Sequence, residues 1–148
     1  MTASTGTRCT SVAFVDTNVL LYAISRAPEE HAKAQRANEI LDSRDVDLSV
    51  QVLQEFYVQA TRPTRVDRLP HEQAVAFIQT LLGFPVQPLT TEVMLAALAT
   101  SDRLGVSYWD AAILEAARAL GCDVVLSEDL ADGQDYDGVR VGNPFRNG

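Results

Sequence analysis

Short apolar segments alternate along this chain with longer segments of helical periodicity, and this alternation limits the possible fold more than any other feature of the sequence. Residues 11–15 form an apolar run that ends at Asp16, and residues 123–127 enclose a similar run. Both are too short for a helix and are typical of buried parallel strands. Further short strands are predicted at 48–50, near Val86 and at 139–141. Helices are predicted between them, over residues 18–25, 31–41, 52–60, 70–82, 91–104 and 107–121. This pattern predicts a three-layer α/β/α fold around a mainly parallel sheet.

The length of 148 residues fits one compact domain, which we expect over residues 11–148, with the small polar segment 1–10 as a frayed end. A hydrophobic content of 47% is enough for a sizeable core. No apolar run reaches about 18 residues, so no membrane span is expected. The two cysteines, Cys9 and Cys122, make neither a disulfide framework nor a zinc pattern, so we expect a reduced, cytoplasmic protein.

The chain is acidic, with a formal net charge of −8 and a pI of about 4.6. Taken alone, this charge argues against a nucleic-acid partner, because basic surface supplies most non-specific binding. Two interpretations stay open: the protein does not bind nucleic acid, or its acids form a site where metal cations mediate the approach.

Acidic residues follow the predicted strands, where the functional crevices of such sheets lie. Asp16 follows the first strand, and Ser127, Glu128 and Asp129 follow a later one. Asp110 stands at a predicted helix start. Asp16, Asp110 and Asp129 are therefore expected to face one edge of the sheet.

Each acid also has an ordinary structural explanation. Asp16 stands where Asp is favoured as a helix N-cap. Asp110 follows Ser107 by three positions, as in a capping box. A helical residue such as Glu55 is usually solvated, and Asp129 can be one of several acids in a surface loop. As a group, however, gathered carboxylates repel one another unless protons or cations compensate. Mg²⁺ or Mn²⁺ suits such oxygen ligands, and the chemistry that they support is hydrolysis of a phosphodiester.

Four motifs in this order resemble those of the PIN-domain nucleases: FVDTNVL at 14–20, QEF at 54–56, YWDAAI at 108–113 and LSEDL at 126–130. The Asp132-Gly133 pair and the ending VGNPF at 141–145 are similar to one branch of that family, the VapC-type toxins. The resemblance extends over residues 12–145, nearly the whole chain.

The resemblance implies a catalytic quartet at Asp16, Glu55, Asp110 and Asp129. It implies that Mg²⁺ (or Mn²⁺) binds to Asp16, Asp110 and Asp129. Glu55 would complete the metal shell or assist proton transfer from water. The small polar residues that support these acids in the family fall on Thr17, Asn18 and Ser127.

The activity implied is cleavage of single-stranded RNA at a phosphodiester by an activated water, as the toxin of a type II toxin–antitoxin pair. Members of the family commonly form homodimers. Their antitoxin inserts a tail into the acidic groove, often with an Arg among the carboxylates. An antitoxin protein and a second copy of the chain are thus the expected partners, besides RNA.

Several other residues have weaker signals. The connector after the Glu55 helix carries the densest basic run, Arg62, Arg65 and Arg68, which either contacts RNA phosphate or is simply solvated. Tyr108 and Trp109 are expected to pack in the core at a helix start, in preference to stacking on a base.

Glu115 and Asp102 are left outside the site, because Asp110 and Glu115 are five residues apart, which is not a same-face helical spacing. His31 and His71 lack metal-ligand spacing and are expected at the surface. Residues 129–137 lack the ligand order of a calcium loop and are expected to form a solvated loop.

Two other functions compete with the nuclease. An aspartyl-nucleophile phosphatase of the haloacid-dehalogenase type would attack with Asp16, but it needs a second Asp two positions later, where this chain has Asn18. A degenerate PIN fold that binds without turnover is the non-enzymatic alternative, and the intact quartet argues against it.

Overall fold

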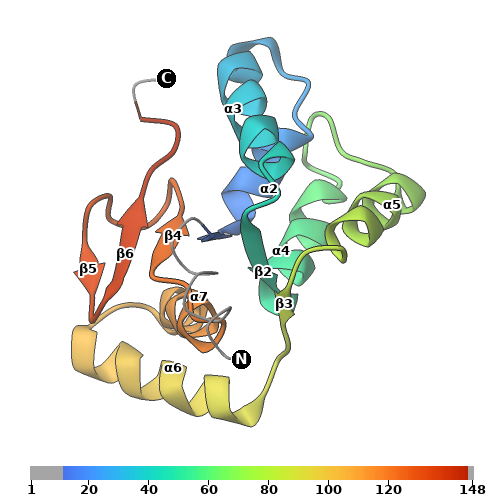
Figure 1. The fold of residues 1–148 in the computed structure, drawn as a ribbon. Coiled ribbons are helices and arrows are strands. Elements are labelled where there is room, and N and C mark those ends of the chain that lie inside the picture. Colours follow the sequence, from blue (N-terminus) through green and yellow to red (C-terminus); the bar gives the residue numbers. More distant parts are fainter. Residues whose placement is uncertain (1–11, 147–148) are drawn as a thin grey trace, which may run out of the picture.

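In the computed structural model, which describes residues 12–146, six strands form one central sheet (Figure 1). Their order across the sheet is β3-β2-β1-β4-β6-β5. Neighbouring strands are parallel except β5, which runs antiparallel to β6. The strands are β1 (Ala13–Val15), β2 (Val46–Ser49), β3 (Val86–Gln87), β4 (Val124–Leu126), β5 (Asp135–Tyr136) and β6 (Val139–Gly142).

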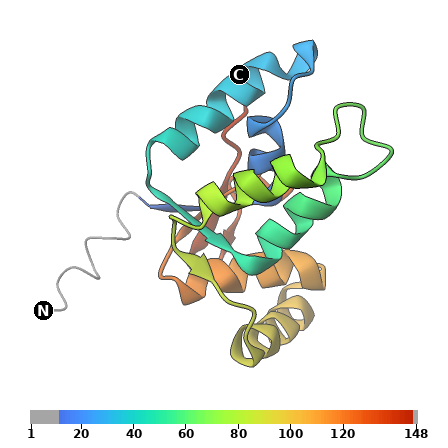
Figure 2. The same cartoon turned by 90° about the vertical axis from the view of Figure 1, so that its right-hand side faces the viewer.

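Helices cover both sides of the sheet. Helices α6 and α7 lie together on one side, and α2 and α3 lie on the other (Figures 1 and 2). Helix α2 packs against both α3 and α4, and α5 packs against α4. The bounds are α2 (Thr17–Ala23), α3 (His31–Asp42), α4 (Val50–Ala60), α5 (His71–Leu81), α6 (Thr91–Leu104) and α7 (Tyr108–Ala119), with a 3₁₀ turn η1 (Pro28–Glu30). The predicted α/β/α fold with a mainly parallel sheet is confirmed.

The central strands are apolar because both of their faces are covered. Phe14, Val15, Leu48 and Val125 are fully buried, and the same core takes up the apolar face of α4 around Phe56. The strands and most of the helices share this core, whereas α6 packs on α7 through a second, smaller cluster of Ala97, Ala111 and Ala112. None of the helices within residues 12–146 has the length and apolar character needed to cross a membrane.

Helix ends follow the signals in the sequence. The hydroxyl of Ser49 accepts a hydrogen bond from the Val52 amide (3.2 Å), and α4 begins there. Gly105 ends α6 in the left-handed conformation, with φ of 70°, which glycine adopts without strain. The predicted cap and the predicted C-terminal glycine are both confirmed.

The region 129–137 was expected to be a solvated loop, and this expectation is wrong at its end. Asp135–Tyr136 forms strand β5 and pairs with β6. Asp137 and Gly138, with φ of 55° and 95°, make the two-residue turn between them. An Asp-Gly pair is a strong hairpin signal, because it tolerates the two positive φ angles that a tight type I′ turn requires. The predicted frayed segment 1–10 lies outside the described residues.

The sheet topology gathers the strand ends that matter for function. Strand β1 lies between β2 and β4, so the next two strands of the chain lie on one side of β1 and the last three lie on the other. This reversal of strand order is a topological switch point, and ligands bind beyond such points in α/β sheets. Val15 pairs with Leu126 in register, and the amide of Asp16 donates to the Leu126 carbonyl at 3.0 Å. Asp16 and Ser127, the next residues on each strand, therefore leave the sheet side by side.

Helices α6 and α7 are joined by a buried polar contact. The Thr100 hydroxyl donates to Glu115 Oε2 at 2.7 Å, and Arg118 Nε lies 3.1 Å from Glu115 Oε1. Glu115 is only 7% exposed. Glu115 thus has a structural role in joining the two helices. Asp102, the other acid left outside the predicted site, is exposed on α6.

We predict that Thr100→Val lowers the free energy of unfolding by about 1–2 kcal/mol, because the nearly isosteric change leaves a buried carboxylate oxygen without its hydroxyl donor. Urea unfolding measures this loss. Thr91→Val, at an exposed position of the same helix, is the control and should change stability by less than about 0.5 kcal/mol. Equal stability of Thr100→Val and the wild type would show that the contact does not hold the two helices together.

Candidate active site

Asp16 is a nearly buried carboxylate at the junction of β1 and α2. Its Oδ1 accepts the Thr17 amide at 2.7 Å, and its Oδ2 accepts the Ser127 hydroxyl at 2.8 Å. Asp16 is the N-cap of α2, so its capping role is real. Burial raises the pKa of Asp16 from 3.8 to about 6. The two hydrogen bonds oppose this rise, whereas the nearby charges of Glu55 and Asp129 add to it.

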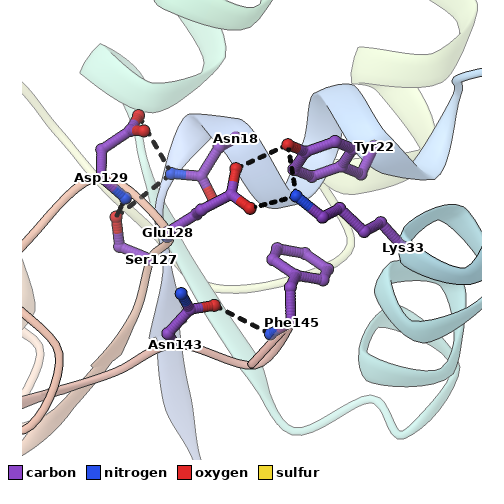
Figure 3. Close-up of polar contacts among 8 residues, drawn as sticks. All are labelled: Asn18, Tyr22, Lys33, Ser127, Glu128, Asp129, Asn143 and Phe145. Carbon is purple, nitrogen blue, oxygen red and sulfur yellow. Dashed lines mark hydrogen bonds and ion pairs between the residues drawn. The ribbon is translucent and has the colours of Figure 1, made fainter. Parts of the chain in front are cut away.

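Asn18 and Ser127 fasten the loop after β4 to the start of α2 (Figure 3). The Asn18 amide nitrogen donates to Ser127 Oγ (3.1 Å) and to Asp129 Oδ2 (3.3 Å), and its oxygen accepts the Glu128 amide (3.1 Å). Ser127 Oγ also accepts the amides of Asp129 and Leu130. Asp129 is itself exposed, so this network presents its carboxylate at the surface beside Asp16.

Glu55 reaches the same place from α4. Its Oε1 accepts the Thr17 hydroxyl at 2.9 Å, and its Oε2 accepts the amide of Gln51, one turn earlier, at 3.3 Å. The structure therefore brings Asp16, Glu55 and Asp129 together from three distant segments. Thr17, Asn18 and Ser127 make the contacts that connect them.

Asp110 stands at the start of α7, where its amide donates to the Ser107 hydroxyl at 3.1 Å, as the predicted cap requires. Within the described residues its carboxylate makes no hydrogen bond to the other three acids. Gln51 connects the two regions, because its amide nitrogen also lies 3.5 Å from the carbonyl oxygen of Trp109. The backbone next to Asp110 thus contacts the acidic group through Gln51, whereas the Asp110 carboxylate itself makes no such contact.

The acids offer the oxygen ligands that a hard divalent ion prefers, but they do not form a closed cage around a single point. Among the residues that the structure describes, no three or more His, Cys, Asp or Glu side chains lie close enough to enclose a metal. All the donors are carboxylate oxygens, which Mg²⁺ and Mn²⁺ prefer. Mg²⁺ keeps several of its waters and is often held by only one or two carboxylates, so this open arrangement fits it.

A cluster of Glu128, Lys33 and Tyr22 lies beside the acids and was not predicted from the sequence. Glu128 forms an ion pair with Lys33 and accepts the Tyr22 hydroxyl at 2.5 Å (Figure 3). Burial alone would raise the pKa of Glu128, but the hydrogen bonds from Lys33 and Tyr22 hold it below its usual value. Glu128 is therefore neutralised by a lysine, whereas its neighbour Asp129 is not.

The three arginines of the connector have different surroundings. Arg65 Nε lies 3.1 Å from Asp67 Oδ1, and Arg65 lines a 230 Å³ pocket together with Thr17 and Asp129. Arg62 lines a second pocket with Glu55, and Arg68 is exposed and lines neither of these two.

The expectation that Trp109 packs in the core is wrong. It is 63% exposed, because the first turn of α7 directs it away from the core. Tyr108 is half-buried and packs against Ala97, Ala111 and Ala112. His31 and His71 are exposed, as predicted.

The fold and the acids at its strand ends define an α/β protein with an anionic site at the topological switch point of its sheet. Residues 13–131 match the PIN domain family, and the chain belongs to that family. No curated protein sequence is similar enough to match.

Several solved structures have the same fold, among them a toxin–antitoxin complex and a toxin. A toxin–antitoxin complex from Klebsiella pneumoniae is similar over 90% of this chain and 98% of its own, with 18% identity and a TM-score of 0.64. DNA-bound VapBC from Salmonella typhimurium is similar over 90% and 98%, with 22% identity and a TM-score of 0.61. VapC20 from Mycobacterium tuberculosis, described as a sarcin-ricin loop cleaving toxin, is similar over 79% and 89%, with 23% identity and a TM-score of 0.60.

We predict that Asp16→Asn removes a pH dependence of stability in EDTA. The pKa of Asp16 is about 6 in the folded state and 3.8 as its reference, so the folded state binds the proton more tightly. The wild type should therefore lose stability as the pH rises from about 4 to about 6, by up to about 3 kcal/mol. The variant lacks this loss, so its stability relative to the wild type should rise across the same interval.

Urea unfolding at pH 4.5 and pH 7.5 measures the difference. Asp102→Asn, at an exposed position, is the control and should follow the wild type at both values. Parallel pH profiles of the wild type and Asp16→Asn would contradict the burial of this charge.

Proposed function

We propose that this protein is a metal-dependent endoribonuclease that hydrolyses RNA phosphodiester bonds. The observation that carries the proposal is the convergence of Asp16, Glu55 and Asp129, from three distant segments, at the switch point of the sheet of a PIN domain. Gathered carboxylates destabilise a fold unless something offsets their repulsion, which favours a function for them. A cation that binds there is the simplest such function.

Each residue has a role in this proposal. Asp16, Asp110 and Asp129 hold Mg²⁺ or Mn²⁺, and the ion supplies activation of water and stabilisation of charge on the phosphate. Glu55 completes the shell or takes a proton from the attacking water. Thr17, Asn18 and Ser127 keep the carboxylates in place through the hydrogen bonds described above. Asp110 is half-buried at a helix start, where a change of rotamer would bring its carboxylate toward the other acids.

We further propose that the protein is the toxin of a type II toxin–antitoxin pair in the cytoplasm, and that it forms a homodimer. The support is the similarity in fold to a toxin–antitoxin complex, to VapBC and to a toxin named for cleavage of the sarcin-ricin loop. The acidic site offers an antitoxin a place for an arginine side chain, which pairs with carboxylates in bidentate geometry.

The phosphatase alternative has no support in the geometry. The position where that chemistry needs a second acid holds Asn18, whose amide is engaged with Ser127, Asp129 and the Glu128 backbone. Turnover of RNA separates the nuclease from a PIN fold that only binds.

We predict that Asp16→Asn and Asp110→Asn each lower the rate of RNA cleavage by about 100-fold or more, because the loss of a metal ligand removes several kcal/mol of charge stabilisation. Cleavage of a labelled single-stranded RNA in Mg²⁺ and in Mn²⁺ measures the rate, with EDTA as the blank. Asp135→Asn, in the β5 hairpin, should cut at the wild-type rate. Cleavage by either variant at the wild-type rate would show that the site assignment is wrong.

We also predict that induced expression arrests the growth of a bacterial host, because a nuclease without its antitoxin degrades essential RNA. The Asp16→Asn form should permit growth at the same protein level, checked by immunoblot. Equal growth curves for the two forms would argue against a toxin, whatever the activity in vitro.

A further inference from the structure

The pocket that contains Arg62 adjoins the acidic site on the α4 side. It has a volume of about 360 Å³ and is lined by residues of α4, by Arg62 and by Trp109. Glu55, one of the converging acids, forms part of its wall. The pocket is thus continuous with the proposed catalytic site, and it lies within the size range of small-ligand sites.

Trp109 gives this pocket an aromatic wall. It is the only tryptophan of the chain, and it is 63% exposed. Its ring and the ring of Tyr108 form a T-shaped pair with centroids 4.9 Å apart, and such a contact covers at most one of the two faces of the indole. A large aromatic ring exposed in a pocket is a stacking surface for unpaired bases.

Arg62 gives the same pocket a cation. It is exposed at the end of α4, and no hydrogen bond or ion pair engages its guanidinium within the described residues. Arg62 thus supplies a positive charge to the pocket that Trp109 lines, on a chain whose net charge is −8. Guanidinium groups bind phosphate through two parallel hydrogen bonds.

A series of contacts links the pocket to Asp16. Gln51 contacts both the Trp109 carbonyl (3.5 Å) and Glu55 (3.3 Å), and Glu55 in turn accepts the hydroxyl of Thr17. A strand of RNA with its scissile phosphate at the acids would therefore place an adjoining nucleotide in this pocket.

We propose that this pocket is a nucleotide subsite, in which Trp109 stacks on one unpaired base of the substrate and Arg62 binds the phosphate of that nucleotide. The subsite rests on the proposed ribonuclease function and deepens it, because it gives the acidic chain a means of holding RNA next to the scissile bond. A base inside a duplex is already stacked on both faces and cannot lie on the indole, so the subsite selects single strands.

The emission of the single tryptophan tests the stacking directly. The probes are a ten-nucleotide oligoadenylate and an abasic oligomer with the same phosphates, titrated into Asp16→Asn protein in Mg²⁺ so that the RNA stays intact. Oligoadenylate should quench Trp109 emission saturably, and the abasic oligomer should not. The anisotropy of an end label on each oligomer measures binding independently.

Variants separate the two parts of the subsite. Trp109→Ala should weaken oligoadenylate binding and raise the KM for cleavage by about tenfold, and Trp109→Phe should restore most of both. Arg62→Ala should weaken the binding of both oligomers and reduce the dependence of that binding on salt concentration. The matched controls, Leu98→Ala (50% exposed) and Arg140→Ala (exposed on β6), should leave binding and KM unchanged.

Labelled RNA that binds without any change in Trp109 emission would overturn the subsite and leave the nuclease intact. Equal quenching by the abasic oligomer would do the same, as would wild-type KM values for Trp109→Ala. If the wild type does not cut RNA at all, the proposed function fails first. In that case, a change in Trp109 emission on addition of a partner protein, but not of RNA, would show that the pocket binds that protein instead.

Discussion

Ser127 donates its hydroxyl to the buried carboxylate of Asp16 over 2.8 Å, and the arrangement of the site depends on this bond. The same oxygen accepts the Asn18 amide and two backbone amides of the loop after β4. One atom thus joins the end of β1, the start of α2 and the loop that carries Asp129. The register of β1 with β4 makes this possible, because it places Asp16 and Ser127 next to each other.

Much of the fold could be predicted, because its signals are local. Apolar runs of strand length, a capping serine such as Ser49 and a glycine at a helix end each report the conformation of their own segment. Strand β5 was missed although its Asp137-Gly138 turn is a local signal, because the surrounding acids favoured a solvated loop. The core position predicted for Trp109 was wrong, because helical periodicity shows which residues share a face of a helix but not whether another layer covers that face.

The candidate site could be predicted only in part. The rule that ligands bind beyond the carboxyl ends of strands selected Asp16 and Asp129, and the family resemblance added Glu55 and Asp110. The connections between them could not be predicted, because they are side-chain contacts between distant segments. Thr17 and Glu55 are 38 residues apart, and sequence spacing says nothing about such a pair.

The ion pair between Lys33 and Glu128 makes the charge of this region depend on a single amine. Lys33 is the only lysine of the chain, and its side chain is 37% exposed. Acylation of that one nitrogen would abolish its positive charge and leave the Glu128 carboxylate uncompensated next to Asp129. An amine-reactive label therefore has one internal target in this protein, and that target adjoins the acids.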